Sequence, residues 1–170
     1  MTGVAALDAA PDDELRVRLR SCCAAESWVE NMIAGRPYRS EPALYAASDH
    51  ATFALDADGL AQALGGHPRI GDAAPPRGGD RRSAAWSRGE QAGVAAADTS
   101  LLGDLAAANS EYERRFGHVY LVCASGRDAA ELLAICRSRL DNDPETERGV
   151  VIGELAKINQ LRLAKLLGEQ

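Results

Sequence analysis

Aromatic residues and alternating β-branched runs are scarce in this chain of 170 residues. Aromatics make up only 5% of it, whereas alanine, leucine, arginine and glutamate are abundant. Strands normally alternate β-branched or aromatic residues with polar ones, and helices favour the residues that are abundant here. The composition therefore predicts an all-α fold. We expect a single domain over residues 1–170, a compact bundle of about eight helices with one short extended segment near residues 118–124.

The sequence also lacks a long apolar run and an excess of positive charge. No stretch approaches the ~18 apolar residues that a membrane-spanning helix needs. The net charge of −6 and the pI near 5.1 argue against binding to nucleic acid, which normally uses a basic surface. The first residues, MTGVAALDAAPDDEL, have no basic region ahead of the apolar ones, unlike a secretory signal. We expect a cytoplasmic protein that binds neither membranes nor nucleic acid.

Spacings typical of metal sites are missing as well. None of the four cysteines forms a C-x-x-C pair, and none of the three histidines lies four residues from another. We therefore expect no metal. The cysteines are expected to be reduced and mostly buried thiols: Cys22, Cys23, Cys123 and Cys136.

Helix-capping residues are present and divide the chain into helices. They precede an apolar pattern with helical spacing at four places: Ser40, Asp56, Asp98 and the capping box Asp128-x-x-Glu131. A short polar side chain at such a position accepts a hydrogen bond from an otherwise unpaired amide of the first turn. Each of the four therefore predicts a helix start.

The last helix is expected to begin at Pro144, a favourable first residue of a helix. Its apolar stripe contains Val151, Leu155, Ile158 and Leu161. Arg162 neighbours this stripe. An arginine at such an edge usually reaches water or pairs with a carboxylate, and less often binds an anion.

Residues 65–91 contain the most irregular part of the sequence. Two prolines and two glycines between the phrases GGHPRIGD and SRGEQ predict a loop over about residues 73–82. Gly65-Gly66 end the preceding helix and allow a sharp turn, and Pro68 stiffens the backbone of His67. The residues alone leave two interpretations of His67 open, a solvated loop histidine and a functional group.

The phrase after this loop, Ser87-x-x-Glu90, has the pattern of a capping box. We therefore expect Ser87 to start a helix that continues towards Ala97, with Glu90 in its first turn. The exposed amides of that turn would offer a site for an anion or a carbonyl group.

The run from His118 to Cys123 is the one strand-like segment, and it has no partner strand. Buried amides without a partner are costly. Either the segment is a buried connector paired with side chains or water, or a ligand supplies the hydrogen bonds.

Several phrases, taken in order, resemble one known family. They are GGHPRIGD, SRGEQAG, NSEYERRFGHVYLVCASGR, RLDNDPETE and ELAKINQLRL. In this order they resemble the OHCU decarboxylase family, and the HPRIG wording is similar to its bacterial branch. OHCU is 2-oxo-4-hydroxy-4-carboxy-5-ureidoimidazoline, an intermediate of urate breakdown. The resemblance runs from about Leu7 to Leu167, and over the first 60 residues it rests on the apolar pattern and Arg36-Pro37-Tyr38.

The resemblance implies an all-α, commonly dimeric lyase that converts OHCU to (S)-allantoin and carbon dioxide without a cofactor. It places the catalytic proton donor at His67 and puts Glu90 in the substrate-binding Ser-x-x-Glu-Gln segment. On chemical grounds we expect Glu90 to be the second catalytic residue, which fixes the tautomer of His67 and can raise its pKa. The resemblance also implies substrate-binding positions, including a segment whose backbone holds the ring: Pro68, Ser87, Gln91, Tyr120, Leu121, Val122, Cys123, Ala124 and Arg162.

The chemistry of OHCU fits these residue types. A conjugated C=N bond beside the carboxylated carbon can take the electron pair that carbon dioxide leaves behind, so no cofactor is needed as an electron sink. A histidine suits the proton transfer. Two other classes stay open: a hydrolase or isomerase of a related ureido heterocycle, and a non-catalytic helical interaction domain.

Overall fold

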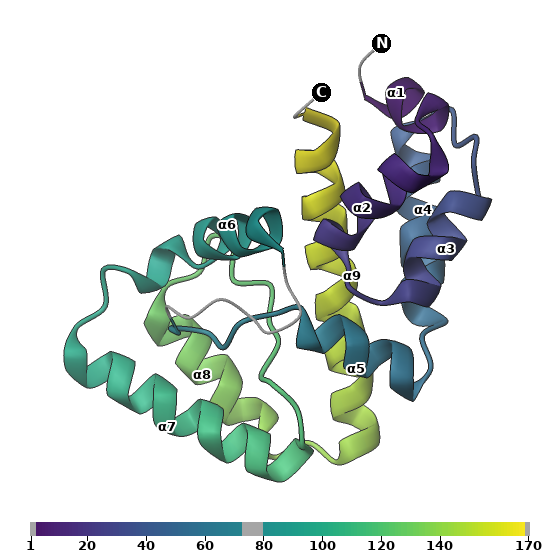
Figure 1. Cartoon of the computed structure of the whole chain (residues 1–170). Helices are drawn as coiled ribbons and strands as arrows, with labels where there is room; N and C mark the ends of the chain where they lie inside the picture. Colours follow the sequence, from purple (N-terminus) through teal and green to yellow (C-terminus); the bar gives the residue numbers. More distant parts are fainter. Residues whose placement is uncertain (1–2, 73–79, 169–170) are drawn as a thin grey trace.

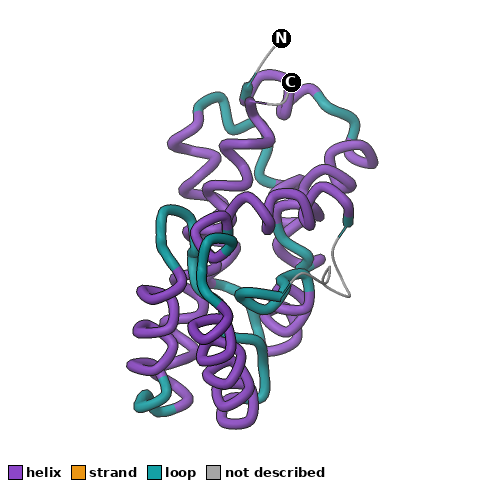
Figure 2. The backbone as a smooth tube through the Cα atoms, turned by 90° about the vertical axis from the view of Figure 1, so that its left-hand side faces the viewer, coloured by secondary structure: helices purple, strands orange, loops and turns teal. Residues whose placement is uncertain are grey.

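The computed structural model describes residues 3–72 and 80–168 of the chain. Within these ranges the chain forms nine α-helices and one short 3-10 helix, η1, and no strand (Figure 2). The all-α class predicted from composition is confirmed. The bounds are α1 Val4–Ala9, α2 Asp12–Cys22, α3 Glu26–Ala34, α4 Glu41–Phe53, α5 Ala57–Gly65, α6 Arg81–Glu90, η1 Ala92–Val94, α7 Thr99–Phe116, α8 Ala129–Arg139 and α9 Pro144–Gly168.

The four predicted caps are confirmed. The side chains of Ser40, Asp56 and Asp98 each accept a hydrogen bond from the amide three residues later, at the start of α4, α5 and α7. The capping box of Asp128 and Glu131 opens α8 with both of its reciprocal bonds. These caps depend only on neighbouring residues, which is why the sequence reveals them.

The predicted helix start at Ser87 is wrong. Helix α6 begins at Arg81, where Asp80 caps it by accepting a bond of 2.7 Å from the amide of Ser83. The earlier start buries Trp86, which is only 8% exposed, on the inner face of the helix. Ser87 and Glu90 therefore lie in the last turn of α6. Of the predicted loop, residues 73–79 lie outside the described residues, and the last two positions belong to α6.

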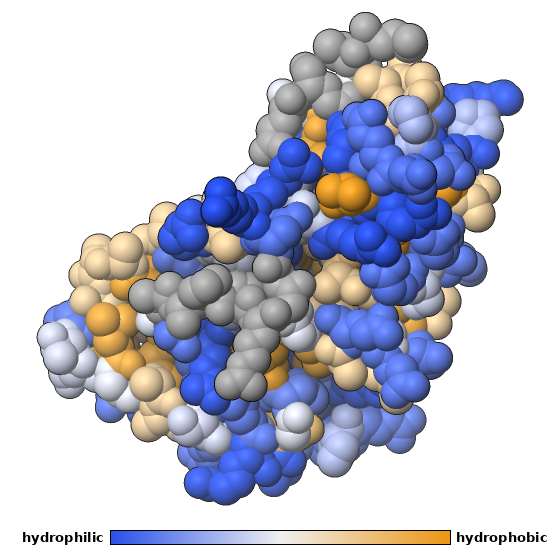
Figure 3. All heavy atoms as spheres, viewed as in Figure 1, coloured by the Kyte–Doolittle hydropathy of each residue, from blue (hydrophilic) through white to orange (hydrophobic). Residues whose placement is uncertain are grey.

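Helix α9 runs between two groups of helices (Figure 1). On one side lie α1 to α5, whose buried side chains form a first apolar core together with those of α9. On the other side, α7 and α8 pack against each other and enclose a second core. Figure 3 shows the face of the molecule that is turned to the viewer in Figure 1. Hydrophilic side chains cover most of it, and apolar side chains gather over the start of α7 and the connection from α6. The expected site lies between the two cores.

The buried stripe of α9 differs from the predicted one at one position. Val151, Leu155 and Ile158 are buried as predicted, but Leu161 is 38% exposed. Arg162, only 2% exposed, takes the inward position instead. A buried guanidinium needs a partner, because an unpaired charge in the interior is costly.

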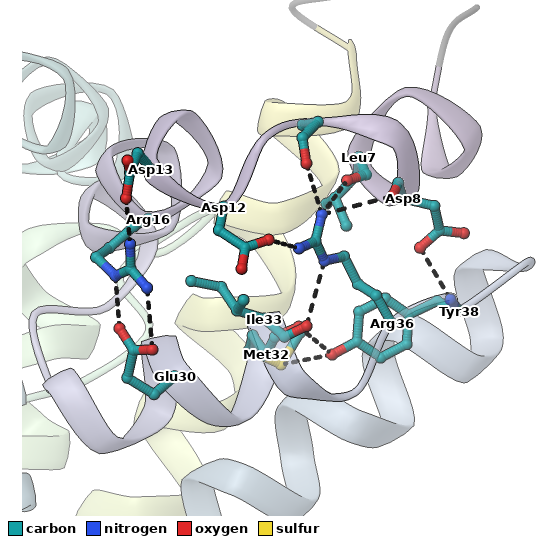
Figure 4. A network of polar contacts seen from close by, with 11 residues as sticks. Leu7, Asp8, Asp12, Asp13, Arg16, Glu30, Met32, Ile33, Arg36 and Tyr38 are labelled. Carbon is teal, nitrogen blue, oxygen red and sulfur yellow. Dashed lines mark hydrogen bonds and ion pairs between the residues drawn. The ribbon is translucent and has the colours of Figure 1, made fainter.

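Arg36 ties the first helices together (Figure 4). Its guanidinium donates to the carbonyl oxygens of Ala10, at 2.7 Å, and Ile33, at 3.2 Å, and pairs with Asp12. Ala10 follows the last residue of α1 and Ile33 lies in the last turn of α3, so the guanidinium connects the ends of these two helices. Tyr38, from the same phrase of the sequence, donates from its hydroxyl to the carbonyl of Met32 at 2.7 Å. The phrase Arg36-Pro37-Tyr38 thus has a structural role.

The cysteines are free thiols, as predicted. Cys22, Cys23 and Cys136 are buried, and Cys123 is partly exposed. Among the helices described here, none combines the length and the apolar character that a membrane crossing requires.

Candidate active site

A small pocket lies where the two apolar cores meet. The first core contributes Leu121 and Ile158 to its wall, and the second contributes Tyr120, Val122 and Ala124. Among the described residues, the lining consists of His67, Pro68, Ile70, Ser87, Glu90, Gln91, Tyr120, Leu121, Val122, Ala124 and Ile158. Segments that are far apart in the sequence thus meet around one space: the turn after α5, the end of α6, the connection from α7 to α8, and α9.

The turn that carries His67 is held at both ends. Its start is fixed by the amide of His67, which donates to the carbonyl of Leu64 at 3.1 Å. Gly71 at its end has φ of 84°, which favours glycine, and its amide donates to Oε1 of Gln91 at 2.9 Å. Between them, Nδ2 of Asn109 donates to the carbonyl of Ile70 at 2.8 Å. His67 therefore sits on a stiffened turn, 9% exposed.

The last turn of α6 forms the opposite wall, and α9 supports it from behind. Arg162 donates through Nε and Nη2 to the two carboxylate oxygens of Glu90, both at 3.1 Å, and through Nη2 to the hydroxyl of Ser87 at 2.9 Å. Lys165 donates to Glu90 at 3.2 Å and lies over the ring of Trp86. Arg162 thus fixes Ser87 and Glu90 and does not itself line the pocket.

The protonation states follow from this arrangement. Burial, and next the nearby positive charge of Arg162, lower the pKa of His67 well below its ordinary value. At neutral pH the imidazole is therefore uncharged. Burial opposes ionisation of Glu90, but the hydrogen bonds and charges of Arg162 and Lys165 outweigh it and lower the pKa of the carboxyl. Glu90 is thus an ionised carboxylate.

The connection from α7 to α8 brings backbone polar groups to the pocket. Its residues 119–124 have no regular secondary structure and run as a drawn-out loop (Figure 1). Tyr120 is anchored by its hydroxyl, which donates to the carbonyl of Leu132 at 2.9 Å. The amides of Tyr120, Val122 and Ala124 have no acceptor within the described ranges. Such amides can donate to a flat ligand that carries carbonyl or carboxylate oxygens.

The comparisons with known proteins point to one family. A family model for OHCU decarboxylase matches residues 8–164. The chain belongs to the OHCU decarboxylase family. A crystal structure of OHCU decarboxylase in the presence of (S)-allantoin superposes with a TM-score of 0.76 and 27% identity, over 94% of this chain and 99% of that one.

Two relatives match this chain over different shares of their own length. The uric acid degradation bifunctional protein of Arabidopsis thaliana is 30% identical over 159 residues, which is 94% of this chain and 48% of that protein. The 2-oxo-4-hydroxy-4-carboxy-5-ureidoimidazoline decarboxylase of Amia calva is 32% identical over 135 residues, 78% of this chain and 75% of that protein. This member of the family thus spans about half the length of the Arabidopsis relative.

The structure brings most of the predicted site residues of this family member to the pocket wall. Two of them, Cys123 and Arg162, lie outside the lining. The expected contact of Glu90 with His67 is replaced by the pairing of Glu90 with Arg162, and the pKa of His67 is lowered, not raised. Two apolar lining residues, Ile70 and Ile158, were not predicted from the sequence, because the prediction looked for polar side chains. Both lie within phrases that carry the family resemblance.

Proposed function

We propose that this chain removes carbon dioxide from OHCU and yields (S)-allantoin, the last step from urate to allantoin, without a cofactor. The observation that carries the proposal is the convergence on one pocket of an uncharged buried histidine, a carboxylate held by a guanidinium, and backbone amides without acceptors. Membership of the OHCU decarboxylase family supports the same reaction.

The reaction needs a place for one electron pair and a route for two protons. When the carboxylate leaves as carbon dioxide, the electron pair of the broken C–C bond moves towards the conjugated C=N bond of the ring. The ring nitrogen then takes a proton from water. The hydroxyl loses its proton to become the carbonyl, and the carbon that bears the ureido group gains one. The protein therefore has to orient the ring and move a proton to one of its faces.

His67 is the group we assign to this proton transfer. Because its imidazole is uncharged at neutral pH, it first accepts the proton of the hydroxyl and then donates it to the ring carbon. Such general acid–base catalysis typically contributes about 10²- to 10⁴-fold. Delivery from one side of the pocket gives one enantiomer of allantoin.

The opposite wall binds and polarises the ring in this proposal. Arg162 and Lys165 carry two positive charges against the single negative charge of Glu90, so the wall has one positive charge in excess. That excess favours the anionic substrate and the negative charge that develops on the ring. Glu90 accepts from the N–H groups of the substrate, and the side-chain amide of Gln91 donates to its carbonyl oxygens. The backbone amides of Tyr120, Val122 and Ala124 hold the ring from the other side.

We further propose a homodimer that works in the cytoplasm. The dimer is the state implied by the family resemblance, and free cysteines suit a reducing compartment. Light scattering of the purified protein should give twice the mass of one chain. A monomeric mass over the concentration range of the activity assay would contradict the dimer.

The proposed reaction is tested with purified protein and freshly generated OHCU. We expect carbon dioxide to be released faster than in the spontaneous decay, with (S)-allantoin as the product. Consumption of OHCU without additional carbon dioxide would indicate a hydrolase or an isomerase instead. No acceleration at all, with no thermal stabilisation by a substrate analogue, would favour an interaction domain.

A further inference from the structure

Helix α9 holds the loop of residues 119–124 from behind through two acidic residues. The first acidic residue, Glu147, accepts from Nε of Arg139 at 2.8 Å. Nη1 of the same arginine donates to the carbonyl of Leu121 at 2.7 Å. At the second, Oε2 of Glu154 accepts directly from the amide of Cys123 at 2.7 Å. Glu147 and Glu154 are seven residues apart, two helical turns, and so lie on the same side of α9.

These two contacts fix which side of the loop faces the pocket. In an extended chain, the polar groups of residues two apart point the same way, and those of the residues between point the opposite way. The carbonyl of Leu121 accepts from Arg139 of α8, and the amide of Cys123 donates to Glu154 of α9, both on the side of the loop away from the pocket. The amides of Tyr120, Val122 and Ala124, which have no acceptor in the described part of the chain, are thereby turned to the other side of the loop. All three residues line the pocket, as Leu121 also does, whereas Cys123 does not.

The same helix carries the opposite wall. Arg162, which holds Ser87 and Glu90, lies eight residues beyond Glu154 on α9. At a rise of about 1.5 Å per residue, the two anchors are roughly 12 Å apart along one rigid helix. Both walls are thus fastened to α9, and the spacing of its side chains sets the distance between them.

We propose that Glu154 is a positioning residue for the reaction: through its bond to the amide of Cys123, it places the backbone that binds the substrate ring opposite the α6 wall. The inference rests on the proposed function. Glu154 acts through Cys123 and does not line the pocket. Its side chain is 12% exposed and also accepts from Lys157 at 2.6 Å. Glu147, by contrast, is fully buried among its partners.

Three variants separate the effect of the bond between Glu154 and the Cys123 amide from that of the neighbouring ion pair with Lys157. Glu154→Ala removes the acceptor for the Cys123 amide. Glu154→Gln removes the charge and keeps an oxygen that can accept this bond. Lys157→Ala, the matched control, removes the exposed partner of the ion pair and leaves the bond to Cys123 in place.

Kinetics with OHCU and exchange of the Cys123 amide with deuterium give two independent readouts. In Glu154→Ala we expect KM to rise about tenfold, because loss of a charged hydrogen-bond acceptor displaces the backbone donors. We expect kcat to change less than about threefold, because His67 stands on another segment. The Cys123 amide should exchange faster. Glu154→Gln and Lys157→Ala should stay within about threefold of wild type in KM.

The outcomes are distinct from those of a merely structural role. Partial unfolding lowers the amount of active protein, which reduces the apparent kcat at an unchanged KM. That pattern in Glu154→Ala would overturn the inference. An equal rise of KM in Lys157→Ala would overturn it too. So would an equal rise of KM in Glu154→Gln if the amide of Cys123 were still protected from exchange in that variant. Wild-type protein that does not accelerate the release of carbon dioxide from OHCU refutes the proposed function itself. Wild-type activity with an unchanged KM in Glu154→Ala refutes only the role of Glu154.

Discussion

His67 decides the chemistry of the pocket through its environment. A histidine on an exposed loop would be partly protonated near neutral pH. Here the imidazole is 9% exposed, and the charged group that shifts its pKa is the guanidinium of Arg162. Both burial and the positive charge disfavour the imidazolium. The residue is therefore prepared to accept a proton before it donates one.

This protonation state predicts the pH dependence of the reaction. The reactive form of the free enzyme is uncharged His67, and its pKa lies well below the ordinary 6.5. As the pH falls from 8 to 6.5, kcat/KM should stay nearly constant, and it should decline only when the pH passes the lowered pKa. Initial rates in buffers of constant ionic strength measure this profile. A decline centred at or above pH 6.5 would contradict an uncharged His67 in the free enzyme.

The pair of Glu90 and Arg162 shows what sequence reasoning could and could not supply. The residue types of the site were predictable, because the phrases that contain them stand out. Their partners were not, because the two residues are 72 positions apart and only the packing of α6 on α9 brings them together. Arg162 was predicted to reach water, to pair with a carboxylate or, less often, to bind an anion, and the long-range fold selects the carboxylate.

At the scale of elements, local signals were reliable where nothing competed with them. Asp56, Asp98 and Asp128 cap helices because each bonds an amide three residues later. Ser87 fits the same sequence pattern but does not cap a helix. Asp80 offers an equally good cap seven residues earlier, and the longer helix buries Trp86. In the folded chain the hydroxyl of Ser87 accepts from Arg162, a partner that no local pattern contains.

The contact of η1 with the start of α8 gives a prediction at this scale. A methyl group at Gly93 would overlap the carbonyl oxygen of Arg127, which belongs to the backbone and cannot rotate away. Gly93→Ala should therefore destabilise the protein by roughly 1–3 kcal/mol, as other overpacked sites do.

The matched control for Gly93→Ala is Gly149→Ala. Gly149 lies inside α9 and has open space around it, so alanine there should stabilise by about 0.5–1 kcal/mol. Urea unfolding of the two variants measures both values. Equal stability of the two variants would show that η1 does not lie against the start of α8.

At the scale of the whole molecule, α9 connects the two apolar cores, and the pocket lies at their junction. Composition predicts the helices but not this junction, because which helices become neighbours depends on long-range packing. The strand-like run shows the same limit. Its lack of a partner strand was visible in the sequence, and the anchors that resolve it, Arg139 and Glu154, come from helices that follow later in the chain.

The stereochemistry of the product shows whether His67 delivers the proton to the ring carbon. Wild-type protein and His67→Asn, matched for folded concentration by far-ultraviolet circular dichroism, are each mixed with freshly generated OHCU, and the enantiomers of allantoin are quantified. We expect an excess of (S)-allantoin from wild type. From His67→Asn we expect a racemate that forms at the spontaneous rate. An undiminished excess of (S)-allantoin from His67→Asn would contradict the assignment of the proton transfer to His67.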